Sequence, residues 1–93
     1  MLSEFRLRQE LNALRLGSGS PLARARKLLR YARRVEVGQA HLVRLSIQAY
    51  GEGEPFRGAL FFQAARSLFR LQMEARNCAS TALKARPVSY GYS

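Results

Sequence analysis

Acidic side chains and side chains that bind metals or act as nucleophiles are scarce in this sequence. It contains no aspartate, six glutamates, one histidine (His41) and one cysteine (Cys78). A single cysteine excludes an internal disulfide, and one cysteine with one histidine cannot supply the ligands of a usual zinc site. General acid–base catalysis usually needs paired carboxylates or an oriented histidine, and no such set is present. We therefore expect a non-enzymatic protein without metal or cofactor, in a reducing intracellular compartment that is either the cytoplasm or an organellar matrix.

The sequence also lacks an apolar run long enough to cross a membrane. Its most apolar stretch, residues 56–73, is interrupted by Arg57, Arg66 and Arg70, whereas a transmembrane helix needs about 20 mostly apolar residues. Glycine loops of the kind that bind phosphates are missing, because residues 17–19 match neither common pattern. The sequence thus predicts no membrane span and no nucleotide hydrolysis.

Positive charge is what the sequence has in excess. Sixteen lysines and arginines against six glutamates give a formal net charge of +10. Fourteen of the sixteen are arginines, whose planar guanidinium pairs with phosphate or carboxylate through two parallel hydrogen bonds. A GC-rich genome would also favour arginine over lysine, but the net charge attracts polyanions for either cause. Because 47% of the 93 residues are hydrophobic, the chain is expected to fold.

The sequence predicts an all-α fold, a small bundle of three to four helices in a single basic domain. The predicted helices cover residues 4–16, 21–36, 39–50 and 55–77, with a flexible connection at 17–20 and an extended tail at 86–93. Ser20 and Pro21 mark the clearest boundary, because serine caps helix N-termini and proline suits the first helical position. Pro55 marks the start of the last helix for the same reason.

Residues 43–50 leave one alternative open. Val43, Leu45 and Ile47 alternate with polar residues, as in a half-buried strand. Leu42 and Leu45, however, also lie on one face of a helix. A lone strand needs a partner strand, and the chain offers few candidates, so a helix is the preferred prediction and a strand the alternative.

The predicted helix 21–36 carries the candidate functional site. At about 100° per residue, its apolar side chains gather on one side. The other side is almost entirely cationic, and we expect it to bind nucleic-acid phosphates or another anion through Arg24, Arg26, Lys27, Arg30, Arg33 and Arg34. A solvated helix face usually mixes charges of both signs, whereas here like charges recur three and four positions apart and repel each other. An acidic partner would relieve that repulsion.

The predicted helix 55–77 is apolar over more than half of its circumference, and the short neighbouring helices are too few to cover it. We therefore expect a partner surface or a second copy of the chain to do so. An aromatic stripe of this kind is more typical of a core than of a surface that stacks on bases. The candidate partner-binding residues are Phe61, Phe62 and Phe69 in the helix and Tyr90 and Tyr92 in the tail.

Residues 25–34 resemble the first helix of the LYR-motif family, small basic three-helix proteins that serve as mitochondrial accessory subunits and assembly factors. A Leu-Leu-Arg element at 28–30 and an Arg-Arg element at 33–34 agree with that helix. The defining Leu-Tyr-Arg is absent, since the Leu-Ala-Arg at 22–24 has only its outer residues and lies two positions too far upstream. The resemblance covers ten residues and implies a helical subunit that docks within an organellar complex.

Two functions remain as hypotheses after these observations. The first is a non-enzymatic accessory protein that docks on the phosphates of RNA or DNA within a nucleoprotein or ribonucleoprotein complex. The alternative is a structural or assembly subunit of a large protein complex, for example a mitochondrial one, whose arginines contact acidic protein or lipid surfaces. A helical homodimer without a ligand of its own is a third, weaker hypothesis.

Overall fold

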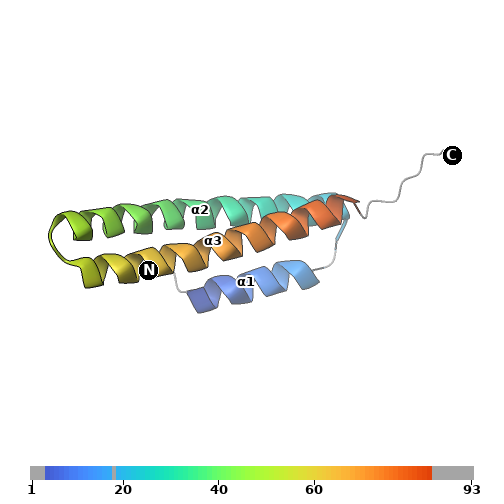
Figure 1. Cartoon of the computed structure of the whole chain (residues 1–93). Helices are drawn as coiled ribbons and strands as arrows, with labels where there is room; N and C mark the ends of the chain where they lie inside the picture. Colours follow the sequence, from blue (N-terminus) through green and yellow to red (C-terminus); the bar gives the residue numbers. More distant parts are fainter. Residues whose placement is uncertain (1–3, 18, 85–93) are drawn as a thin grey trace.

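The computed structural model describes residues 4–17 and 19–84, which form three α-helices (Figure 1). Helix α1 spans Glu4–Leu16, α2 spans Pro21–Gly51 and α3 spans Pro55–Lys84. The two long helices run antiparallel as a hairpin, and α1 lies along the half of the hairpin farther from the α2–α3 turn. The predicted all-α bundle is confirmed, with three helices in the described residues. None of these helices is long and apolar enough to cross a membrane.

Helix α2 is longer than predicted, because the separate helices expected at 21–36 and 39–50 are one continuous helix. The strand alternative for 43–50 is therefore wrong. Gly38 lies in the expected gap, and a glycine inside a helix costs about 1 kcal/mol relative to alanine. Packing along α3 on both sides of this glycine outweighs that cost, as the buried side chains of Val35 and Ser46 show.

Local residue preferences set where α2 begins and how the chain reverses direction between α2 and α3. The Ser20 hydroxyl oxygen accepts a hydrogen bond from the backbone N–H of Ala23 at 3.1 Å, and Pro21 occupies the first turn, as predicted. In the turn between the long helices Gly53 has a φ of 76°, a conformation that glycine adopts without the steric cost of a side chain. These residues fix the start of α2 and the reversal of the chain.

Helix α3 begins at Pro55 as predicted but runs to Lys84 instead of ending near residue 77. The buried side chains of Ala79 and Ala82 continue its row of contacts with the rest of the bundle, so packing extends the helix. The predicted tail at 86–93 lies outside the described residues.

The core lies where all three helices meet, in the half of the hairpin that α1 covers. Its buried members are Leu7, Leu11, Ala25, Leu28, Tyr31, Ala32, Val35, Leu68, Leu71, Ala75, Ala79 and Ala82. Nearer the turn, α2 and α3 approach each other through smaller groups, and Ser46, Ala49, Gly58 and Ala65 are buried there. The Ser46 hydroxyl donates a hydrogen bond to the backbone carbonyl of Gly58 at 2.8 Å. The large side chains of the core are thus concentrated at one end of the molecule.

Helix α1 is attached to the hairpin by a small set of contacts. Leu7 and Leu11 are buried, and the Tyr31 hydroxyl donates a hydrogen bond to the backbone carbonyl of Leu7 at 2.6 Å. The Arg8 guanidinium pairs with the Glu74 carboxylate at 2.6 Å, and a second ion pair joins α1 to α2. Ion pairs this exposed contribute about 0–1 kcal/mol each. Apolar burial and the tyrosine hydrogen bond therefore provide most of the stability of the contact between α1 and the hairpin.

Replacing Tyr31 with phenylalanine is expected to change how stability depends on pH. Burial, reinforced by the Glu10 carboxylate, raises the pKa of Tyr31 to about 12, against 10.0 for an ordinary tyrosine. Above pH 10 the unfolded chain releases this proton while the folded chain retains it, so stability present below pH 10 is lost as the pH rises towards 12. The Tyr31→Phe variant does not show this decrease in stability at high pH. Because it lacks the hydrogen bond to Leu7, it is less stable than the wild type at neutral pH by about 1 kcal/mol.

Urea unfolding at about pH 8 and about pH 11 measures both effects, with the difference between the two proteins isolating Tyr31 from the other titrating groups. Every side chain other than residue 31 is the same in the two proteins. An identical loss of stability between the two pH values in both proteins would contradict the prediction.

Candidate anion-binding surface

Five of the six predicted anion-binding residues form a row on the outer side of α2, which we name the basic row: Arg26, Lys27, Arg30, Arg33 and Arg34. All five are exposed, and the row spans about 12 Å along the helix at about 1.5 Å per residue. The side of α2 that faces α3 holds the buried residues of the same segment. The helix thus turns its cationic side chains towards solvent.

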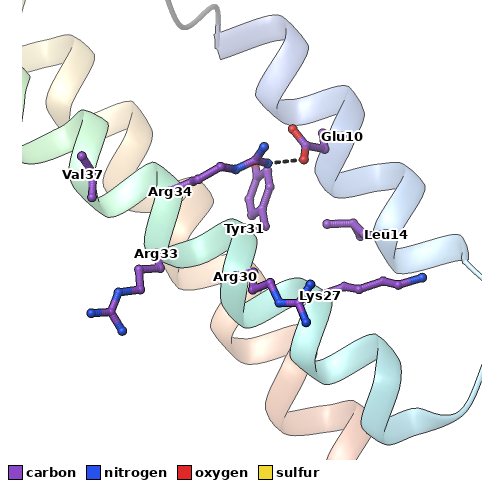
Figure 2. Close-up of a pocket in the computed structure, with 8 residues that line it drawn as sticks. All are labelled: Glu10, Leu14, Lys27, Arg30, Tyr31, Arg33, Arg34 and Val37. Carbon is purple, nitrogen blue, oxygen red and sulfur yellow. Dashed lines mark hydrogen bonds and ion pairs between the residues drawn. The ribbon is translucent and has the colours of Figure 1, made fainter.

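A shallow groove of about 530 Å³ runs between α1 and the basic row (Figure 2). Leu14, Tyr31 and Val37 are the aromatic and aliphatic side chains among its walls, and four members of the basic row border it. In Figure 2 Lys27 extends towards the C-terminal end of α1, whereas Arg33 points away from α1. The groove therefore presents several cations on different sides of one open surface.

Among the described residues, Glu10 is the one acidic residue that lines the groove, and it is already paired. The Glu10 carboxylate accepts a hydrogen bond from the Arg34 guanidinium, which also lies 5.8 Å from the centre of the Tyr31 ring (Figure 2). Among the described residues, Arg26, Lys27, Arg30 and Arg33 form no ion pair. These four charges are free for an external anion, and an anion would relieve their mutual repulsion.

Arg24 does not belong to the basic row. It lines a second hollow, of about 380 Å³, together with Arg15 at the C-terminal end of α1, and its Nε atom is buried with no hydrogen-bond partner among the described residues. Leu14, Leu28 and Cys78 contribute to the same hollow. Arg24 is therefore turned away from the face on which the sequence pattern placed it.

The predicted partner-binding aromatics occupy different environments. Phe62 and Phe69 are exposed on α3, whereas Phe61 is half-buried and its ring lies 6.0 Å from the Arg57 guanidinium. Tyr90 and Tyr92 lie outside the described residues. Phe62 and Phe69 are thus the members of this set that the structure presents to solvent.

Two features of the surface carry no signal in the sequence. Tyr31 lies among the charges in the sequence, yet its side chain is buried and hydrogen-bonded to α1. Glu10 lies 24 positions from Arg34, so no helical spacing predicts their pairing. Both contacts depend on where α1 docks. In the described residues no three histidine, cysteine or acidic side chains gather in a way that could hold a metal ion.

Comparisons of the chain with protein families, with curated proteins and with solved structures found no match. The resemblance of residues 25–34 to the LYR-motif helix gains no support from them. The function has to be argued from the charge and geometry of the basic row.

Proposed function

We propose that the protein is a non-enzymatic accessory protein that docks on nucleic-acid phosphates through the basic row, within a nucleoprotein or ribonucleoprotein complex. The observation that carries the proposal is that four exposed cations on one helix face have no acidic partner in the described part of the chain. Arginine contributes three of them, and its guanidinium matches a phosphate through two hydrogen bonds. A polyanion with regularly spaced charges can pair with several cations of this row at once, whereas a single small anion cannot.

The same row predicts binding without sequence preference. Base edges are read mainly by bidentate arginine, asparagine or glutamine contacts made deep in a groove, or by aromatic side chains that stack on unpaired bases. The aromatic residue among the basic row is Tyr31, which is buried and cannot stack on a base. The remaining contacts are charge contacts to the backbone, which position a nucleic acid but carry no sequence information.

A salt titration of a fluorescent single-stranded RNA with the purified chain tests the proposal. With four phosphate contacts, log K should fall against log salt concentration with a slope of about −3, so that affinity drops roughly 50- to 60-fold between about 50 mM and about 200 mM salt. Duplex DNA should show a similar or steeper slope. Absence of binding at low salt, or an affinity that salt does not change, would contradict the proposal.

A further inference from the structure

In the part of the chain that the structure describes, no third helix lies over the half of the hairpin next to the α2–α3 turn (Figure 1). The hydrogen bonds and ion pairs of α1 reach the hairpin at Tyr31, Arg34 and Glu74, all away from that turn. Large apolar side chains of the uncovered half are exposed, among them Ile47 at 66% and Phe62 at 49%. An apolar surface is therefore left without a cover from the described residues.

Several apolar side chains form a single face that begins in the uncovered half and continues along α3 to the level of Glu74, and we name it the apolar face: Val43, Ile47 and Tyr50 of α2 with Phe62, Phe69 and Met73 of α3. On each helix these residues recur at helical spacing and thus share one side. The α2 row continues to Glu36 and the α3 row continues to Arg76, and these two side chains form an ion pair at 3.4 Å. That contact places both rows on the same side of the hairpin.

The apolar face looks away from α1. Arg34 and Glu74 bond to α1, and they precede Glu36 and Arg76 by two positions, which is about 200° around a helix. Helix α1 and the apolar face are therefore on opposite sides of the hairpin. Movement of α1 along its own side would not cover the face.

Cations flank the apolar face on both helices. Arg44 lies beside Val43 and Ile47 on α2, and Arg66 and Arg70 lie beyond Phe62 and Phe69 on α3. All three arginines are exposed and form no ion pair among the described residues. A second copy of the chain would bring these like-charged margins towards each other, which costs energy. The charges instead fit an occupant that is apolar in the middle and anionic at its edges.

No side chain of the apolar face lines the groove beside the basic row or the hollow around Arg24, and the small hollow on the outer side of α3 is bordered by Arg66 and Arg70 at the margin of the face. A partner helix binds best in a groove, whereas a lipid surface accepts a flat row of apolar side chains between cations. Phenylalanine and isoleucine enter the boundary of the acyl chains, and arginine pairs with lipid phosphate.

We propose that the apolar face binds anionic membranes, with the hairpin lying flat on the lipid surface and Arg44, Arg66 and Arg70 in the headgroup layer. This binding uses a different side of the molecule from the basic row and does not rest on the proposed nucleic-acid function. It requires no segment that spans the bilayer.

Co-sedimentation with vesicles tests the proposal, using phosphatidylcholine alone and phosphatidylcholine with about 30% phosphatidylserine. The wild type should bind the anionic vesicles, and the double variant Ile47→Ser, Phe69→Ser should bind them at least tenfold more weakly. The control is Phe56→Ser, Leu60→Ser, which removes one phenylalanine and one aliphatic side chain, both exposed, from another side of α3. The control should bind like the wild type.

None of these substitutions changes the net charge, so adsorption by charge alone would leave all three proteins equal and would overturn the proposal. An equal loss of vesicle binding in the control variant, or no binding of the wild type to anionic vesicles, would also overturn the proposal. A solution dimer that dissociates in the Ile47→Ser, Phe69→Ser variant, without vesicle binding, would assign the face to a second copy instead. An unchanged far-UV circular dichroism spectrum and an unchanged urea unfolding midpoint in this variant show that it remains folded.

Discussion

Reversing the charge of Arg30 and Arg33 together is expected to weaken RNA binding on the order of 100-fold at about 50 mM salt and about tenfold at about 200 mM. Both side chains are exposed and without an ion pair among the described residues, so each is free to contact one phosphate. Each contact with a single strand releases about 0.7 of a bound cation, and losing two makes the salt dependence shallower by about 1.4 in slope. Fluorescence anisotropy with labelled RNA measures both quantities.

A matched control separates the basic row from net charge. The double variant Arg66→Glu, Arg70→Glu changes the net charge by the same amount on α3, where the two side chains are also exposed. We expect it to lose far less RNA affinity than the Arg30→Glu, Arg33→Glu variant. Equal losses of RNA affinity in the two variants would mean that the affinity depends on the overall charge of the chain. The assignment of RNA binding to the basic row would then be wrong.

Truncating Leu71 to alanine is expected to be the most destabilising single change in the core. Its side chain is 0% exposed where the three helices meet. A leucine-to-alanine change at such a site costs about 2–5 kcal/mol, because apolar burial is lost and a cavity remains. For a chain of this length each kcal/mol lowers Tm by roughly 4–8 °C. Urea and thermal unfolding followed by circular dichroism at 222 nm, the usual wavelength for α-helix, measure the loss.

The same substitution at Leu60 is the control for that measurement. Leu60 belongs to the same helix but is 54% exposed, and surface changes usually alter stability by less than about 0.5 kcal/mol. A comparable loss of stability at Leu60 and Leu71 would show that the uncovered half of the hairpin is packed as tightly as the core.

The boundaries that the sequence predicted correctly are those fixed by local chemistry. Ser20 caps α2 and Pro21 follows it, because both preferences act within one helical turn. The continuity of α2 through Gly38 was not predictable in this way, since the glycine disfavours a helix locally and only contact with α3 offsets it. The length of α3 beyond residue 77 depends on tertiary packing for the same reason.

The candidate site was predictable to a similar extent. Helical spacing placed most of the basic row on one face, because charged side chains on an amphipathic helix turn to solvent wherever the helix packs. It misplaced Arg24, which lies at the edge of that face and is drawn into the hollow beside Arg15. The pairing of Glu10 with Arg34 and the burial of Tyr31 required the position of α1, which no periodic pattern contains.

The all-helical fold also sets how fast this chain can fold. Most native contacts lie within the three helices and join residues that are close in sequence, and only residues 52–54 separate α2 from α3. Helical proteins of such low contact order fold within about microseconds to milliseconds. A ribosome adds a residue about every 50–200 ms. The hairpin therefore reaches its folded arrangement between successive additions, as soon as α3 has emerged.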